Sequence, residues 1–541
     1  MHEGALGECG APPGPLIVVL MRPDLLALIP VHGTDGAELD LLSRCGDAFA
    51  AFPASQRRWS ASAVLEVRLL AAVHAVAAQM AAGELARGDV SLYLNGHFEH
   101  KALAAASIAA PAALAAPDES CRNPIRDPGG ILRAFGTASV LDLSLDRSPD
   151  QESYYCYSRH TRLLGIGRGT TDRQMMLGAV LEYLERWAAS SLPESAVHGA
   201  WRDFPGRALR PAHVLGLSED VCAAAFPDFT EVRRMPWLPC TLEHSGEEAL
   251  IPVQMVNYLL PTDVPVGFNT NSSGCALGNC RDEAALFAAL EVIERDALLL
   301  TWYSKSAPPR IVLDSISDQT TRELLMLLDL CGYEVRCFDV TVEFEVPSVM
   351  AVLLGREAGN LAVFVTAASH PSPVLALRSA LAEAKSLIRT AERNFRRRQA
   401  ALAAAQADHS VLGEDNQLLY YAHREHLHHF DFLLAAQESL GYDDYLATYP
   451  FAAQRPAEAY RALKERMRAL GYPLLVCDNT VPMMRPFGLS SVRAFIPGTI
   501  NMVFGDHPIH LPQGRLARAA ASRPWVRDVP VPVHPQLHPL G

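Results

Sequence analysis

The chain has 541 residues, a formal net charge of −13 and 49% hydrophobic residues. This composition is typical of a globular protein with a sizeable core and excludes the disordered, fibrous and coiled-coil classes. The acidic balance argues against non-specific binding to nucleic acid or to an anionic membrane, since both need a basic surface. Eleven cysteines without a CxxC pair favour a reduced, cytoplasmic protein over a disulfide scaffold.

Residues 1–130 are predicted to form a small N-terminal α/β domain for docking or partner binding, and we find no catalytic motif in them. The apolar segment 16–31 contains Arg22, Pro23 and Asp24, so it is too interrupted for a membrane span or a signal peptide. A long helix is expected over about 60–87. An alanine-rich stretch and the prolines that follow it predict a linker near 110–135.

Helices and strands alternate in the second predicted domain, 131–541, which indicates an α+β fold class. A helix is expected over 317–333, with Ser317 or Asp318 as its N-cap and Gly332 as its end. Strands are expected at 334–342, 348–355 and 361–369. A further helix at 456–472 is followed by expected strands at 473–480 and 491–498.

Two segments of this second domain, 165–190 and 271–300, resemble each other. Each combines a glycine-rich segment with a strongly apolar helix that ends in Glu-x-x-Glu-Arg, here called the ExxER motif. The two copies lie 109 residues apart, and their motif residues are Glu182, Glu185, Arg186, Glu291, Glu294 and Arg295.

The chemistry of these motifs follows from their helical spacing. Residues at i, i+3 and i+4 share one helix face, and charges on an apolar, buried helix are costly unless they are paired or bound to a cation. Glutamates converging from two helices would form an oxygen-rich site for Mg²⁺, shared with phosphate oxygens. The arginines would take phosphate charge or hold the carboxylates, and the glycine-rich segments would offer N–H groups to phosphate. The alternative is that each motif is a solvated or salt-bridged helix face.

At these motifs the sequence resembles the YcaO family of ATP-dependent enzymes that modify peptide backbones. The resemblance runs from about residue 130 to the C-terminus, with support from 368–384, 420–434 and 492–509. It implies a YcaO-type fold in which the two repeated helix-borne motifs face one nucleotide site. The 492–509 stretch and the proline-rich C-terminus resemble the azoline-forming branch. That branch cyclodehydrates Cys, Ser or Thr residues of ribosomal precursor peptides to thiazolines or oxazolines.

The resemblance implies ATP and Mg²⁺ as cofactors and assigns roles to the motif residues. The motif glutamates match those that hold Mg²⁺ and the nucleotide, and the motif arginines match those that follow each pair. Arg168 stands where the family usually has a lysine near the nucleotide. Ser273, counted among the nucleotide-binding residues, lies in a Ser-Ser-Gly stretch that replaces the family's Ser-Asn-Gly. Glu383 opens the counterpart of a family Glu-x-x-Gln-x-Arg segment, whose later positions differ here.

The C-terminal tail is rich in prolines and ends at Gly541. In azoline-forming members such a tail enters the active site and its terminal carboxylate aids proton transfer, a catalytic role that Gly541 would carry here. The alternative is an extended, disordered tail.

Partners and rival functions also follow from the resemblance. Residues 1–130 are short for binding a leader peptide, so a separate leader-binding partner protein is expected beside the precursor peptide, and a homodimer is a family-level expectation. The alternatives are thioamide or amidine formation and a non-catalytic scaffold. The tail and the 492–509 stretch argue against the first, and the intact motifs argue against the second.

Overall fold

The computed structural model describes most of the chain beyond residue 119 and four short segments before it. The described residues are 16–21, 26–31, 89–94, 97–102, 119–125, 127–137, 143–148, 153–158, 161, 163–169, 171–193, 195–226, 229–258, 271–357, 359–398, 402, 414–504, 511–527 and 537–540.

Four described strands near the N-terminus form one antiparallel sheet in the order β1-β2-β3-β4. The apolar segment 16–31 supplies the first two, paired with Leu16 opposite Val31. The helix expected at 60–87 lies outside the described residues, as do residues 110–118 and 126 of the linker expected near 110–135. The described remainder of that stretch includes the short helix α3, Pro128–Ile131. The strands of this sheet are β1 Leu16–Met21, β2 Leu26–Val31, β3 Asp89–Leu94 and β4 His97–Ala102.

In the described part of the second predicted domain, the strands form three further sheets, which confirms the mixed α+β class. A three-stranded sheet runs β5-β6-β7, a six-stranded sheet runs β10-β9-β17-β18-β11 with β8 beside β9, and a five-stranded sheet runs β15-β14-β13-β12-β16. Their bounds are β5 Leu143–Arg147, β6 Ser153–Ser158, β7 Leu164–Arg168, β8 Val197–Gly199, β9 Met235–Leu242, β10 Glu247–Pro252, β11 Cys275–Gly278, β12 Arg310–Ile311, β13 Tyr333–Asp339, β14 Ser348–Gly355, β15 Val363–Ser369, β16 Ser439–Leu440, β17 Leu475–Asp478 and β18 Ser490–Phe495.

The elements predicted downstream of residue 317 are confirmed with small shifts at their ends. Helix α9, Gln319–Leu330, begins after Asp318, whose carboxylate accepts the N–H of Thr321, as an N-cap should. It ends before Gly332, which has a φ of 89° that glycine tolerates best. Strand β14 has the predicted bounds, and β13, β15, β17 and β18 overlap the remaining predictions.

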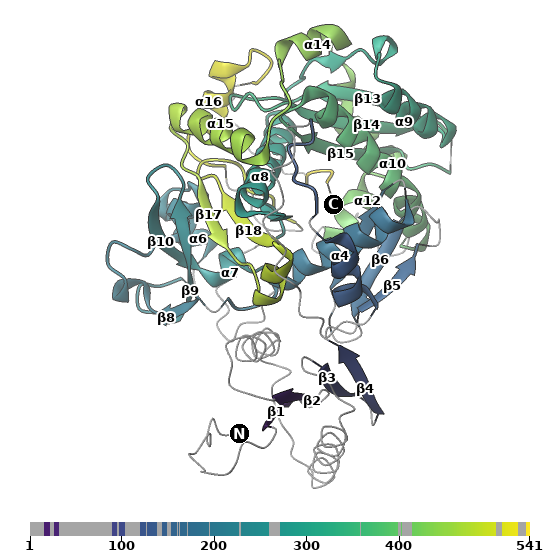
Figure 1. Ribbon diagram of the computed structural model, residues 1–541. Coiled ribbons are helices and arrows are strands. Elements are labelled where there is room, and N and C mark those ends of the chain that lie inside the picture. Colours follow the sequence, from purple (N-terminus) through teal and green to yellow (C-terminus); the bar gives the residue numbers. More distant parts are fainter. Residues whose placement is uncertain are drawn as a thin grey trace.

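Helix α8, Arg281–Ser304, occupies the centre of the fold (Figure 1). It packs on β11 and β18 of the six-stranded sheet and also on β14 and β15 of the five-stranded sheet. Leucines and alanines along almost its whole length are buried in the largest hydrophobic cluster. A helix that is apolar on nearly all sides is stable only when covered on all sides, and two sheets provide that cover here.

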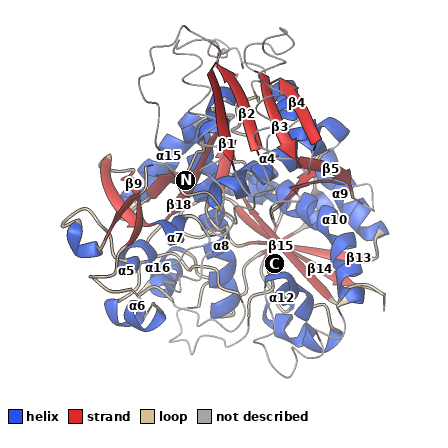
Figure 2. Ribbon diagram, turned by 90° about the horizontal axis from the view of Figure 1, so that it is seen from below, coloured by secondary structure: helices blue, strands red, loops and turns tan. Residues whose placement is uncertain are grey.

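Two other long helices cover sheet faces. Helix α4, Asp172–Ala189, packs on β6 and β7, and helix α10, Pro373–Arg397, packs on β14 and β15 beside α9 (Figure 2). The remaining helices are α3 Pro128–Ile131, α5 Pro211–Leu215, α6 Glu219–Ala225, α7 Val253–Val256, α12 Glu414–Tyr420, α13 Asp431–Leu434, α14 Tyr442–Thr448, α15 Pro456–Ala469 and α16 Arg515–Ser522, with short 3-10 or π turns between them. Among the described residues, no helix is both long and apolar enough to cross a lipid bilayer.

A buried ion cluster joins the C-terminal helix α16 to the central helix. Arg515, fully buried, donates to both carboxylate oxygens of Asp296 and to Glu343. Asp296 also accepts the N–H of Ile500 at 2.7 Å. Because removing one partner of a buried ion pair leaves an uncompensated charge, this cluster fixes α16 against α8.

Glycines allow β7 and α4 to approach each other closely. A Cβ placed on Gly167 would lie 1.6 Å from the carbonyl oxygen of Met175, and one on Gly165 would lie 2.1 Å from that of Ala179. These contacts are with helix backbone, which cannot turn aside as a flexible side chain can. The glycine-rich segment before the first motif is therefore needed for strand–helix packing.

We expect Gly167→Ala to destabilise the protein by several kcal/mol, because its methyl group must push β7 off α4. Gly359→Ala is the matched control, since a Cβ there meets nothing within 4 Å. Urea unfolding of both variants measures the difference. Equal stabilities would show that the strand and helix separate at little cost.

Candidate active site

The motif glutamates stand at matching positions of successive strand–helix units. In the described part of the chain, β7 precedes α4, β11 precedes α8 and β15 precedes α10. Glu182, Glu291 and Glu383 each lie ten residues after the first residue of their helix. The third unit lacks the ExxER signature, so the sequence pattern revealed two copies where the structure contains a third helix with an equivalent glutamate.

The first glutamate of each motif is held by a backbone amide of its own unit. Glu182 accepts the N–H of Ile166 in β7 at 2.9 Å. Glu291 accepts the N–H of Gly274, just before β11, at 3.2 Å. A hydrogen bond from a fixed amide compensates part of the cost of burying a carboxylate.

The second glutamate of each motif is held by the next unit along the chain. Glu185 on α4 accepts the N–H of Leu277 in β11 at 3.0 Å, across 92 residues of sequence. Glu294 on α8 accepts the N–H of Ser369 at the end of β15, also at 3.0 Å. These bonds bring the two ExxER motifs together, although the sequence separates them by 109 residues.

Three of the amides that hold the glutamates lie in the glycine-rich segments that were predicted to bind phosphate. The N–H groups of Ile166, Gly274 and Leu277 lie in the glycine-rich segments and are donated to carboxylates. These three amides are thus bound to carboxylates, and phosphate binding by the glycine-rich segments stays a prediction. Strands β7 and β11 each lie at the edge of a sheet, so N–H groups on their outer side have no neighbouring strand to bond and can donate to side chains.

The motif arginines hold the carboxylates in place. Arg186 Nη2 lies 2.9 Å from Glu182. Arg295 lies 3.6 Å from Glu291 and 3.8 Å from Glu294, and its buried Nε has no hydrogen-bond partner among the described atoms. Of the two roles predicted for the arginines, pairing with the glutamates is the one that the geometry displays.

The five glutamates 182, 185, 291, 294 and 383, here called the glutamate cluster, interact electrostatically. Burial raises the pKa of Glu185 to about 8, and the charges of Glu291 and Glu182 add to the shift. Burial likewise raises the pKa of Glu294 to about 8, with a contribution from Glu383. Carboxylates that are crowded and buried favour a proton or a cation over the free anion.

The donor set suits a magnesium ion carried by phosphate oxygens. Mg²⁺ binds oxygen ligands and usually takes one or two carboxylates together with substrate phosphates. In the described ranges, no three Asp, Glu, Cys or His side chains converge in a geometry that would hold a metal ion by themselves. The glutamate cluster therefore fits a shared metal–phosphate site better than a closed metal cage.

The other predicted site residues lie around the cluster. Arg168 ends β7, and its charge lowers the pKa of Glu383, which burial raises. Ser273 directly precedes Gly274 and donates its N–H to Asn271. Gly541 lies outside the described residues.

The described end of the tail, residues 537–540, is buried against the domain. Gln417 donates to the carbonyl oxygen of His538, and Tyr421 donates to that of Leu537. Burial lowers the pKa of His538 to about 3, and the charge of Arg295 contributes to that shift. His538 therefore lies close enough to Arg295 of the second motif for the charge of Arg295 to affect its pKa.

Sequence reasoning did not place two further residues in the site. Glu383 was recognised as the first residue of a family segment, but the later positions of that segment differ from the family, so no role was assigned to it. Arg493 in β18 is buried, donates to the carbonyl oxygen of Val256 and lowers the pKa of Glu291, which burial raises. No spacing rule marks Arg493, because a strand residue reaches the cluster only through sheet pairing with β11.

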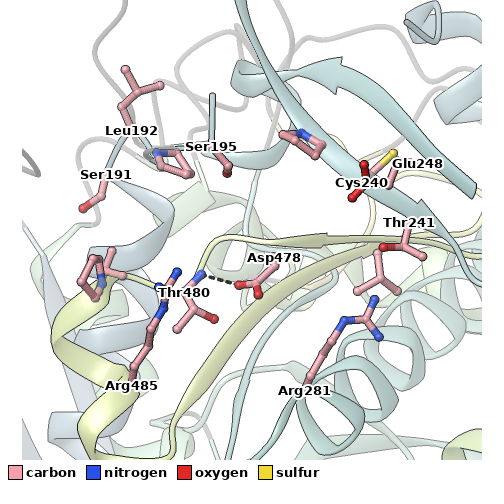
Figure 3. A pocket seen from close by; sticks show the side chains of 15 residues that line it. Ser191, Leu192, Ser195, Cys240, Thr241, Glu248, Arg281, Asp478, Thr480 and Arg485 are labelled. Carbon is pink, nitrogen blue, oxygen red and sulfur yellow. Dashed lines mark hydrogen bonds between the residues drawn. The ribbon is translucent and has the colours of Figure 1, made fainter. Parts of the chain in front are cut away.

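A cavity of about 370 Å³ lies apart from the glutamate cluster, near the ends of β9 and β17 (Figure 3). Arg281, Arg485 and Asp478 line it together with the chain that follows α4. Strand β17 pairs with β9 only as far as Cys240, and the next β9 residue is Pro239, which has no N–H to continue the ladder. The glutamates are not among the residues that line this cavity.

We expect the ligand-free chain to become less stable as the pH rises from about 5 to 8, because Glu185 and Glu294 then lose protons that the folded state retains. Their folded pKa values exceed the ordinary value of 4.5, so the folded state binds more protons than the unfolded chain in this range. Thermal unfolding in a chelator measures the slope. Glu294→Gln should reduce it, and an unchanged slope in that variant would contradict the assignment.

Comparisons with known proteins identify the family and the fold of this chain. A family model described as YcaO cyclodehydratase, ATP- and Mg²⁺-binding, matches residues 166–500. An uncharacterised protein from the tfuA 3′ region of Rhizobium leguminosarum bv. trifolii is 29% identical over 247 residues, which are 42% of this chain and 54% of the relative. This chain spans about half the length of the curated relatives it matches.

Two solved structures share the fold. A heterocyclase in complex with substrate and cofactor superposes with a TM-score of 0.58 and 17% identity, covering 90% of this chain and 73% of that chain. The heterocyclase TruD superposes with a TM-score of 0.56 and 16% identity, covering 90% of this chain and 70% of that chain. The family match spans both ExxER helices and α10, and so the whole glutamate cluster. The chain belongs to the YcaO family.

Proposed function

We propose that this protein cyclodehydrates Cys residues, and Ser or Thr residues, of a ribosomally made precursor peptide to thiazoline or oxazoline rings at the expense of ATP. The observation that carries this proposal is the partly buried glutamate cluster, assembled from both ExxER helices and α10. The family description, which names cyclodehydratase activity with ATP and Mg²⁺ binding, supports it. So do the two heterocyclases that share the fold, one of which holds substrate and cofactor.

The proposed reaction needs ATP because an amide oxygen is a very poor leaving group. The peptide thiol or hydroxyl attacks the preceding carbonyl carbon, and the resulting oxyanion takes the γ-phosphoryl group. That attack closes the five-membered ring and releases the thiol or hydroxyl proton. Departure of phosphate, with loss of the amide N–H proton, then forms the C=N double bond of the azoline. The peptide loses one water in total, and ATP becomes ADP and phosphate.

The glutamates would hold Mg²⁺, which neutralises charge that develops on the transferring phosphoryl group. The chain's own residues prepare for this. Backbone amides fix one oxygen of each motif glutamate, which leaves the other oxygen for an arginine or a ligand. Arg186 and Arg295 keep the carboxylates oriented, and such preorganisation avoids reorganisation during the reaction.

Two further assignments remain proposals. The C-terminal carboxylate of Gly541 would accept or relay a proton at the peptide, and the burial of residues 537–540 near Arg295 supports this. A separate leader-binding protein would deliver the precursor peptide, with residues 1–130 as its docking module. Thioamide or amidine formation would use the same ATP site, but the packed tail favours azoline formation.

We expect wild-type protein, supplied with a precursor peptide and its leader-binding partner, to consume ATP and yield a peptide lighter by one water per ring. Glu291→Ala should reduce the rate by at least about 100-fold, since it removes an oriented carboxylate from the phosphoryl-transfer site. Peptide mass and released phosphate report the reaction. Glu465→Ala, which changes an exposed glutamate of α15, is the control. Full activity of Glu291→Ala would refute the site assignment.

We expect a chain shortened by residues 537–541 to bind ATP but to form rings at least about 10-fold more slowly, because a general acid–base group is lost. Calorimetric titration with an ATP analogue and peptide mass separate the two effects. A second variant that adds one alanine after Gly541 moves the carboxylate and keeps the tail. Undiminished ring formation by both variants would remove the tail from the mechanism.

A further inference from the structure

The segment 119–125, here called the connector, crosses the N-terminal turn of α8 and is fastened there (Figure 1). His370 lies with Nε2 3.2 Å from the carbonyl oxygen of Ser120, and its Nδ1 accepts the N–H of Ser372, so Nε2 carries the proton and donates it. The N–H of Asn123 is donated to Glu283 at 3.0 Å, and Asn279 donates to the carbonyl oxygen of Asn123. The connector is thus held to the domain by specific hydrogen bonds.

The fastening points adjoin the amides that hold the glutamate cluster. Asn279 lies two residues after Leu277, whose N–H holds Glu185. His370 directly follows Ser369, whose N–H holds Glu294. The connector therefore touches both chain segments that orient the second glutamate of each motif.

Cys121 has a left-handed backbone conformation, which sets the direction of the following residue, Arg122. Cys121 has a φ of 50° and is completely buried in the largest hydrophobic cluster. A non-glycine residue rarely adopts this conformation unless its surroundings demand it. Burial of Cys121 holds the turn, and Arg122 follows it.

Arg122 presents a guanidinium group to the edge of the cluster. Its Cζ lies 3.6 Å from the ring centroid of Phe287, which stands one helical turn before Glu291 on α8. Its Nη1 lies 3.5 Å from Glu283. Partial burial lowers the pKa of the Arg122 guanidinium, while the charges of Glu283 and Glu185 act in the opposite direction. A motif glutamate is thus close enough to act on this arginine.

The geometry leaves the guanidinium able to bind an anion. Half of the Arg122 side chain is exposed, and one of its nitrogens contacts Glu283. Stacking on an aromatic ring occupies the face of the group and leaves its N–H edge free to donate in its plane. Guanidinium groups of this kind suit phosphate oxygens.

We propose that Arg122 is a nucleotide-binding residue that donates to a phosphate oxygen of ATP from the side of Glu185. This inference rests on the proposed ATP site and adds to it a residue outside the segment 166–500 that matches the family. The connector would then form one wall of the nucleotide site. It would also link the chain before residue 119 to the site through a single ordered turn.

The test is titration of the full-length chain with Mg²⁺ and a non-hydrolysable ATP analogue. Arg122→Gln should weaken binding about 10- to 100-fold, as expected for loss of a charged hydrogen bond, while Arg122→Lys should weaken it less. Affinity for adenosine, measured by competition, should be unchanged because adenosine has no phosphate. Arg281→Gln is the matched control: this arginine pairs with the buried Glu243 at the same end of α8 but lies at the separate cavity.

The outcomes separate this inference from the proposed function. Equal affinity of wild type and Arg122→Gln for the ATP analogue would overturn the role of Arg122 alone. A lower melting temperature with unchanged affinity, or an equal loss for adenosine, would overturn it too, in favour of a structural pair with Glu283. No binding of the analogue by wild type would overturn both this inference and the proposed function.

Discussion

The burial of several carboxylates in one place is the constraint on which the rest of this structure depends. Glutamates brought out of water repel one another and are tolerated only with donors or cations nearby. Here each motif glutamate receives a backbone N–H, and each motif arginine lies within ion-pair distance of a glutamate. The pKa values near 8 for Glu185 and Glu294 show that these partners compensate only part of the cost. The remaining cost favours a ligand that brings positive charge.

The strand–helix units follow from this need for donors. The amides within a helix are bonded to its own carbonyl groups, so backbone donors for its glutamates come from other segments, here from strands β7, β11 and β15 and from the residue just before β11. Strand β11 donates an N–H group to Glu185 on the preceding helix α4. Gly274, just before β11, donates an N–H group to Glu291 on the following helix α8. One short segment, 274–278, therefore donates hydrogen bonds to glutamates of both motifs. This explains why the motifs can lie far apart in sequence and still share one site. The close approach of Gly167 to α4 belongs to the same arrangement.

The sequence comes closest to the structure where a local rule applies. The N-cap at Asp318 and the bounds of β14 were predictable because helix capping and a continuous apolar run of strand-forming residues are both local features of the sequence. The helical faces of Glu182 and Glu185, and of Glu291 and Glu294, were predictable for the same reason. Glu383 was harder, because the residues at i+3 and i+4 from it are Ser386 and Leu387, which carry no charge to complete the motif. Arg493 reaches the cluster through sheet pairing, and the connector places Arg122 on the ring of Phe287, one helical turn before Glu291. Neither arginine leaves a periodic mark in the sequence.

By itself the sequence determined the fold class, the two motif helices, their charged faces and, through its resemblance, the family. These properties depend on periodicity and residue type, which involve residues close together in the sequence. The tertiary structure decided which amides bind which glutamates, gave the glycine-rich segments a packing role, brought Glu383 and Arg493 to the cluster and placed Arg122 beside it on Phe287. Those facts depend on contacts between residues far apart in the chain, such as Glu185 with Leu277 and Ser120 with His370. Only folding sets such distances, because the energy that selects them comes from burying charge and apolar surface together.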